Sequence, residues 1–293
     1  MWFLYSISSA FAETVKDILS KKYLKNIDEY SLAAAFHVWT LLFSIPLLVR
    51  FGIPVLKTEF WIGSFLFLFI TPTWTILYAK AIKGAELSKV LPIMALNPVM
   101  TALLTFVVGG DQLTFYDWAG ILFICFGMYS MYIKVKDKNS LSLKSFFQPI
   151  QSIWESNGSK AMFGVALLWS IGAHVSKLRV DGSSPVFSTF TGGLIGVSTT
   201  WIIALYMRKK GLFQSFRTHY IGLFGVGLFY YLATLLSSIA LSVGNAAFVF
   251  SVKRSSILFG SLYGFLRLKE SFSLAKLIGL VFLTLGIVML AML

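Results

Sequence analysis

Two adjacent cations, Lys253 and Arg254, lie deep inside an apolar segment of the chain, 244–266. On insertion scales a charge at the centre of a membrane helix costs about 2.5–3.5 kcal/mol, so such a pair needs carboxylates, carbonyls or an anionic ligand. Arginine can bind a carboxylate or a phosphate through two parallel hydrogen bonds, and lysine adds a compact positive charge. Ser255 and Ser256 supply hydroxyls beside them. The pattern predicts an anion-binding site.

A second charged group lies on the first apolar segment, at the spacing of one helix face. It consists of Ser9, Glu13, Lys16, Asp17 and Ser20. Because the other faces carry Phe, Leu, Ile and Val, we expect this stripe to face the protein interior. Either carboxylate could take up and release a proton, or the group could be an ion-pair network that fixes the helix. In a third interpretation the two carboxylates neutralise the cations of segment 244–266, which would then be structural.

Several single residues are weaker candidates. His37 and His174 fall within apolar segments, where a lone histidine either takes part in proton coupling or is a hydrogen-bonded structural residue. They form no metal-binding pattern with the single cysteine, so we predict no metal and no cofactor. Trp74 and Tyr231 could line a binding cavity or serve only in packing. Asn97 lies beside prolines that remove helical hydrogen bonds; it can support the freed carbonyls and is a further substrate-binding candidate.

The composition indicates that membrane-spanning helices position these residues. The 293-residue chain is 57% hydrophobic and 13% charged, with a mean hydropathy of +0.79, outside the balance of a soluble globular domain. Segments long and apolar enough to cross roughly 30 Å of hydrocarbon as helices recur along it. They are 2–19, 30–49, 59–79, 86–108, 115–134, 160–177, 185–207, 218–238, 244–266 and 273–292. We therefore expect an all-α integral membrane protein of ten transmembrane helices.

The positive charge is concentrated in alternate loops. The chain has 25 Lys and Arg residues and a net charge of +13, and most of these cations lie in or beside 20–29, 79–85, 133–160, 207–219 and 267–276. This asymmetry follows the positive-inside rule, so we attribute it to the cytoplasmic membrane surface and not to nucleic acid. By this count both termini lie outside. Within the spans the cations outnumber the carboxylates by one, which favours an anionic or zwitterionic solute.

An internal repeat divides the chain. Ala81–Gly127 aligns without a gap on Ala240–Gly286, which places Gly120 on Gly279. Because each half holds five predicted spans, an odd number, the second half must enter the membrane from the opposite side, so we expect inverted repeats. The predicted domains are a first five-helix repeat at 1–133, a linker at 134–159 and a second five-helix repeat at 160–293. The linker is either a plain connection or carries an amphipathic helix on the membrane surface.

Four passages carry a family resemblance. They are Leu91–Pro98 and Gly110–Thr114 in the first half, and Val252–Ser256 and Leu268–Ser273 in the second. With the two five-helix halves they resemble the EamA family of the drug/metabolite transporter superfamily, over nearly the whole chain. The resemblance implies a ten-helix secondary carrier that works by alternating access, with its site between the halves. It also implies that both termini lie inside, opposite to the result of the charge count.

The Lys253-Arg254 step is similar to one on the ninth helix of triose-phosphate transporters, which belong to the same superfamily. In that family the step binds the substrate phosphate. A further lysine of the family would fall on Met94, so the resemblance implies only part of a phosphate site.

These features predict a secondary transporter for a small organic metabolite, with anionic or zwitterionic solutes favoured. The alternatives are an amphipathic drug or lipid translocator, or an integral-membrane enzyme. The sequence has no phosphate-cradling loop, paired-histidine metal motif or nucleophile elbow, so we predict no catalytic residues. The expected partners are a small-molecule solute and the lipid bilayer, with proton coupling as an open question and the oligomeric state undetermined. The expected location is the plasma (inner) membrane.

Overall fold

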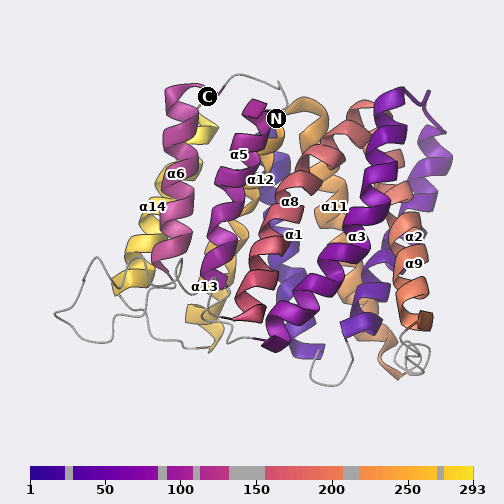
Figure 1. The fold of residues 1–293 in the computed structure, drawn as a ribbon, viewed down its shortest axis with the longest axis horizontal. Coiled ribbons are helices and arrows are strands. Elements are labelled where there is room, and N and C mark those ends of the chain that lie inside the picture. The colour runs from indigo at the N-terminus through magenta and orange to yellow at the C-terminus, as the bar shows by residue number, and fades with distance from the viewer. Residues whose placement is uncertain are drawn as a thin grey trace. The chain divides into compact units, whose positions relative to one another are not determined.

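The computed structural model describes residues 1–23, 29–84, 91–107, 113–131, 156–206, 218–268 and 274–292. These residues form helices and turns with no strand among them, which confirms the all-α prediction (Figure 1). In chain order the elements are α1 (Trp2–Tyr23), α2 (Glu29–Phe51), α3 (Thr58–Gly84), η1 (Leu91–Leu96), α5 (Asn97–Val107), α6 (Phe115–Ser130), α8 (Asn157–Asp181), α9 (Pro185–Tyr206), α11 (Tyr220–Val243), α12 (Ala246–Lys253), α13 (Ser256–Leu268) and α14 (Leu274–Ala291). Among the described residues, each predicted apolar segment overlaps one helix or two consecutive ones. The predicted linker up to residue 155 lies outside the described residues, as do the acidic turns at Asp111 and Glu270.

The helices form two compact units. The first unit comprises Met1–Pro72 and Val175–Asn245, and the second comprises Thr73–His174 and Ala246–Leu293. Helices α3 and α8 continue from one unit into the other, and α3 does so at Pro72. Each unit therefore contains helices from both halves of the sequence.

The first unit contains α1, α2, α9 and α11 together with parts of α3 and α8. In it, α1 packs along α11, and α2 packs along both α9 and α11. Its apolar core consists of Leu32, Ala35, Leu223 and Val226, with Leu19, Phe36 and Trp39 packed against them. Glycines on α9 allow a close approach to α2. A Cβ atom at Gly193 would lie 2.8 Å from the backbone nitrogen of Leu41, and one at Gly196 would lie 2.1 Å from Nδ1 of His37. Larger side chains at these two positions would force the helices apart.

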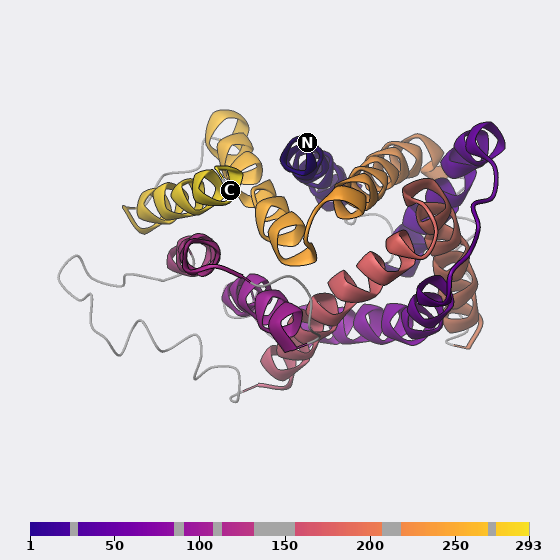
Figure 2. The same ribbon diagram turned by 90° about the horizontal axis from the view of Figure 1, so that it is seen from above.

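In the second unit, α6 and α14 lie side by side as an antiparallel pair (Figure 1, Figure 2). A Cβ atom at Gly127 would lie 2.6 Å from the carbonyl oxygen of Gly279. A Cβ atom at Gly286 would lie 2.5 Å from the carbonyl oxygen of Gly120. The repeat aligns these four glycines in the pairs Gly120 with Gly279 and Gly127 with Gly286. Gly127 therefore contacts Gly279, the residue aligned with Gly120, and Gly120 contacts Gly286, the residue aligned with Gly127.

Two of the predicted spans are broken helices, and both breaks lie in the second unit. In the first, the 3₁₀ helix η1 gives way to α5 at Asn97, and Pro98 has no amide to donate. In the second, α12 ends at Lys253 and α13 begins at Ser256, with 3₁₀-type bonds between them. The amide of Arg254 bonds to the carbonyl three residues earlier at 3.1 Å. The register that places Ala81 on Ala240 also places Asn97 on Ser256, so the two copies break at matching positions.

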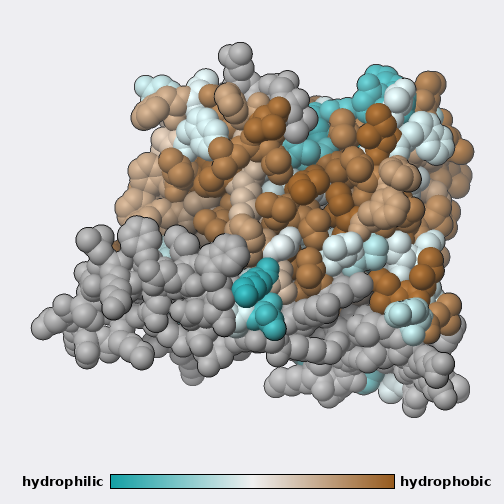
Figure 3. All heavy atoms as spheres, viewed as in Figure 1, coloured by the Kyte–Doolittle hydropathy of each residue, from teal (hydrophilic) through white to brown (hydrophobic). Residues whose placement is uncertain are grey.

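The surface of the described residues is rich in apolar side chains, and most of the coloured part of the face in Figure 3 is hydrophobic. Exposed examples are Phe65 and Leu205 in the first unit and Leu122 and Val281 in the second. Helices long and apolar enough to cross a membrane are found at Leu32–Phe51, Asn157–Asp181, Pro185–Ile203, Tyr220–Val243 and Leu274–Ala291, and a shorter apolar stretch is Ile93–Val107. An apolar exterior of this kind suits a hydrocarbon surrounding.

Candidate functional site

Arg254 lies at the helix break of the second copy and contacts residues from two other helices of the same unit. Its Nη2 donates a hydrogen bond to Oδ1 of Asn97 at the start of α5. Its guanidinium carbon lies 5.6 Å from the ring centroid of Trp169 on α8, within the range of a cation–π interaction. Trp74 meets Trp169 edge to face at 5.7 Å. The structure thus brings together three of the predicted site residues, Arg254, Asn97 and Trp74, and adds Trp169.

Asn97 is fixed by α8 as well as by Arg254. Its Nδ2 donates to the carbonyl oxygen of Ala166 at 3.1 Å and to the hydroxyl of Ser170 at 2.8 Å. The side chain is buried, with 1% of its surface exposed. Both hydrogens of the amide are therefore used within the protein, and only its oxygen faces the guanidinium. Through this oxygen the Asn97 side chain positions Arg254.

The serines around Arg254 add buried hydroxyls. Ser255 is 1% exposed, and its Oγ has no hydrogen-bond partner among the described residues. The same holds for Ser251, one helical turn earlier on α12. Ser256 begins α13. Nζ of Lys253 lies 5.7 Å from the ring centroid of Phe250. Sequence reasoning missed Ser251, which stands four residues before Ser255 in the predicted span 244–266.

His174 is hydrogen-bonded through both ring nitrogens. Nδ1 lies 3.1 Å from the carbonyl oxygen of Ser170, and Nε2 lies 2.9 Å from Oγ1 of Thr105. A carbonyl oxygen only accepts, so Nδ1 carries a proton in this arrangement. Thr105 Oγ1 also lies 3.0 Å from the carbonyl oxygen of Thr101. Within the described ranges there is no group of three or more potential metal-ligating side chains near this histidine or elsewhere.

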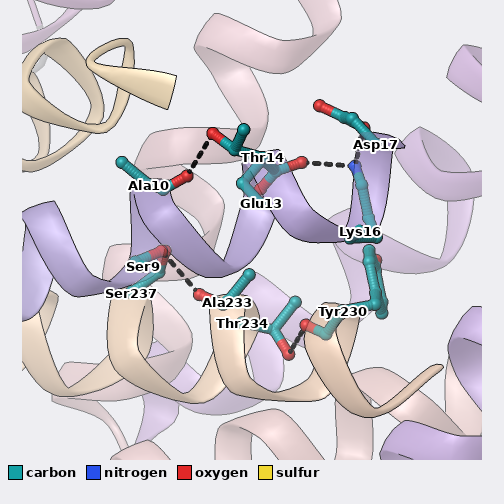
Figure 4. Close-up of polar contacts among 10 residues, drawn as sticks. All are labelled: Ser9, Ala10, Glu13, Thr14, Lys16, Asp17, Tyr230, Ala233, Thr234 and Ser237. Carbon is teal, nitrogen blue, oxygen red and sulfur yellow. Dashed lines mark hydrogen bonds and ion pairs between the residues drawn. The ribbon is translucent and has the colours of Figure 1, made fainter. Parts of the chain in front are cut away.

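The charged stripe of the first segment forms an ion-pair cluster in the first unit (Figure 4). Nζ of Lys16 lies 2.6 Å from Oε1 of Glu13 and 2.7 Å from Oδ1 of Asp17. Ser9 donates to the carbonyl oxygen of Ala233 at 2.7 Å. Asp17 departs from the inward-facing prediction, because 62% of its side chain is exposed. Lys16 is buried and faces the protein, as expected, and Ser20 is buried as well.

The remaining candidates of the first unit lie in aromatic packing. The ring of His37 meets that of Tyr230 edge to face at 5.7 Å, and its Nδ1 packs against Gly196. Tyr231 is buried, with its ring 5.6 Å from that of Phe43. Both residues thus have packing contacts that suffice to explain their burial.

Sequence reasoning also missed Arg179, which lies just beyond the predicted span 160–177. The structure buries it, with 3% exposed. Its Nη2 donates to the carbonyl oxygen of Ser188 at 2.7 Å and to Oγ1 of Thr191 at 2.9 Å, and its guanidinium carbon lies 4.3 Å from the ring centroid of Phe67. Arg179 therefore ties α8 to α9 and α3. Its place two residues before the end of α8 gives no sequence signal for this burial.

Apolar helices with buried charges, two of them interrupted at aligned positions, are features of an integral membrane protein. The family comparison agrees. The EamA-like transporter family matches residues 1–133 and 157–292, and the chain belongs to this family. A solved structure, described as "Crystal structure of protein", matches with a TM-score of 0.74 and 15% identity, covering 98% of this chain and 95% of that chain. At this identity the likeness shows a shared fold. No curated protein matches the sequence.

Proposed function

We propose that the protein is a secondary transporter that moves a small organic anion or zwitterion across a membrane by alternating access. The observation that carries this proposal is the pair of helix breaks at matching positions, with Arg254 held at the second. In carriers built from inverted repeats, such interrupted helices bind the substrate, because their unwound backbone and buried side chains offer polar groups inside the membrane.

The glycine contacts support inverted repeats. If α6 ends the first repeat and α14 ends the second, helices that run antiparallel about a two-fold axis make the crossed glycine contacts observed. We therefore propose ten transmembrane helices in two inverted repeats, 1–133 and 160–293, which are joined by the linker 134–159.

The charge at the break favours an anionic group on the solute. A guanidinium can donate two parallel bonds to a carboxylate or a phosphate, and Lys253 adds a second positive charge in the adjacent position. The buried hydroxyls of Ser251 on α12 and of Ser255 in the break are further donors. Met94 stands where a phosphate-specific relative would carry a lysine, so carboxylates fit the site at least as well as phosphate esters.

Proton coupling is assigned to the ion-pair cluster of α1. Protonation of Glu13 or Asp17 would remove one of the two negative charges that face Lys16, so the cluster can respond to a proton gradient by opening. The plasma (inner) membrane is the proposed location. A C-terminal reporter that is active only in the cytoplasm would show on which side of the membrane the termini lie.

A flux screen in proteoliposomes tests the proposal. Purified protein is supplied with carboxylates, phosphate esters, amino acids, amines and a fluorescent phospholipid, and saturable uptake of each is measured. We expect uptake of a carboxylate or phosphate ester that Arg254→Gln weakens and Arg267→Gln leaves unchanged. Arg267 is the matched control because it is an exposed cation in the last turn of α13. Uptake confined to amines or to the phospholipid would refute the proposed solute class.

A further inference from the structure

We infer that Asn97 sets the charge selectivity of the site: its neutral amide holds the guanidinium of Arg254 in place without adding a negative charge. This inference rests on the proposed role of Arg254 and goes further, since it makes Asn97 a positioning residue and not a contact of the solute.

The first step is the direction of the amide. Nδ2 has two hydrogens, and the structure gives it two acceptors on α8, the carbonyl oxygen of Ala166 at 3.1 Å and Oγ of Ser170 at 2.8 Å. The reverse orientation would aim the amide oxygen at the Ala166 carbonyl and the amide nitrogen at the guanidinium. That would place acceptor against acceptor and donor against donor. Oδ1 must therefore face Arg254, as it does.

The second step is the rigidity of this arrangement. Asn97 and Ser170 are both fully buried. The hydroxyl of Ser170 lies 2.9 Å from the Ala166 carbonyl oxygen and 3.2 Å from the backbone oxygen of Asn97 itself. Thr101 donates to that same backbone oxygen at 2.8 Å. The amide cannot turn without breaking bonds to α8, so it presents a fixed oxygen to the guanidinium from the start of α5.

The third step concerns charge. Trp169 holds the guanidinium through a ring face and Asn97 holds it through an amide oxygen, and neither contact carries a formal charge. A carboxylate at position 97 would be nearly the same size, but it would lower the net charge beside Arg254 by one and would form an ion pair with it. The guanidinium would then bind the carboxylate at position 97 in place of the anionic group of the solute. Selectivity should shift from anionic toward uncharged solutes.

The experiment compares two classes of probe in proteoliposomes containing the full chain. The anionic probes are succinate, lactate and glycerol 3-phosphate, and the uncharged counterparts are succinamide, lactamide and glycerol. For wild-type protein and each variant, KM, maximal rate and the ratio of anionic to uncharged uptake are measured. We expect Asn97→Asp to lower this ratio at least tenfold, through KM for the anion. Asn97→Ala, which removes the orienting oxygen and adds no charge, should raise KM for the anion several-fold and leave the maximal rate near that of wild type.

Thr101→Val is the matched control. It removes a hydrogen bond to the backbone of Asn97 and leaves the amide untouched, so the ratio should stay at the wild-type value. A merely structural role of Asn97 would lower the maximal rate for both probe classes together and leave the ratio unchanged, which would overturn the inference. If Asn97→Asp does not fold, Asn97→Ala decides: a raised KM for the anion supports the inference, and an unchanged KM overturns it. A lowered ratio in Arg254→Gln with an unchanged ratio in both Asn97 variants would overturn this inference alone. No anion uptake by wild-type protein would overturn the proposed function and this inference with it.

Discussion

Replacement of Gly127 by alanine should destabilise the second unit, because it adds a methyl group where α6 touches α14. The new Cβ would lie 2.5 Å from the backbone nitrogen of Leu283 and 2.6 Å from the carbonyl oxygen of Gly279. Both neighbours are backbone atoms, so no side-chain rotation can make room. The two helices must move apart, and the contacts along the whole pair weaken.

The magnitude follows from two opposing contributions. Alanine gains about 0.8–1 kcal/mol over glycine in helix propensity. Overpacking a tight contact costs about 1–3 kcal/mol, and a backbone neighbour puts this position at the upper end. The net loss in the free energy of unfolding is then about 1–2 kcal/mol. At roughly 2–4 °C per kcal/mol, the midpoint of thermal unfolding should fall by roughly 2–8 °C.

The assay is thermal unfolding of the purified protein in detergent, followed by tryptophan fluorescence. Gly225→Ala is the control, since its Cβ would meet only the Leu19 side chain, at an ordinary 3.5 Å. That variant should unfold at the wild-type midpoint or above it. The double variant Gly127→Ala/Gly279→Ala should lose less than the sum of the single losses, because both methyl groups enter the same gap. A Gly127→Ala midpoint equal to that of Gly225→Ala would refute the close helix pairing.

Variants at three further residues test other parts of the structure. Arg179→Gln should lower the unfolding midpoint, because charged hydrogen bonds of about 1.5–3 kcal/mol are lost. Arg179→Lys should not restore the midpoint. A wild-type midpoint in either variant would contradict the role of Arg179 in tying α8 to α9 and α3. Trp169→Leu should raise KM for an anionic solute about 2- to 30-fold through loss of a cation–π contact with Arg254 of about 0.5–2 kcal/mol, and an unchanged KM would remove Trp169 from the site. Glu13→Gln should abolish the response of uptake to an imposed pH gradient and retain uptake down the solute gradient. A wild-type response to the pH gradient would leave Glu13 as only a structural partner of Lys16.

The helical architecture could be predicted because hydrophobic length alone specifies it. A span of apolar residues in a membrane must satisfy its own backbone hydrogen bonds, so each predicted segment is helical in the structure. The first helix break could also be anticipated, since Pro98 removes an amide donor beside Asn97. The break at Arg254 could not, because no proline or glycine marks it and its 3₁₀-type bonds depend on the surrounding packing.

The composition of the site was partly predictable for a related reason. Arg254 and Lys253 stand out because charge is costly inside an apolar segment. Trp169 and Ser170 do not, because an aromatic ring and a small hydroxyl are ordinary in such helices and gain a role only through tertiary contact. For Asp17 only part of the environment was predictable. Helical spacing placed it beside Lys16, which it contacts, but spacing does not specify that the Asp17 side chain lies at the exposed edge of the stripe.

Binding of the solute's anionic group by Arg254 is tested most directly by KM for the best anionic solute, measured in wild type, Arg254→Lys and Arg254→Gln. Loss of charged hydrogen bonds worth about 1.5–3 kcal/mol predicts a rise in KM of roughly 10- to 150-fold for Arg254→Gln. Arg254→Lys should lie between wild type and Arg254→Gln, because it keeps the charge and loses the planar fork. Equal KM values for all three proteins, at equal recovery of folded protein, would contradict the account.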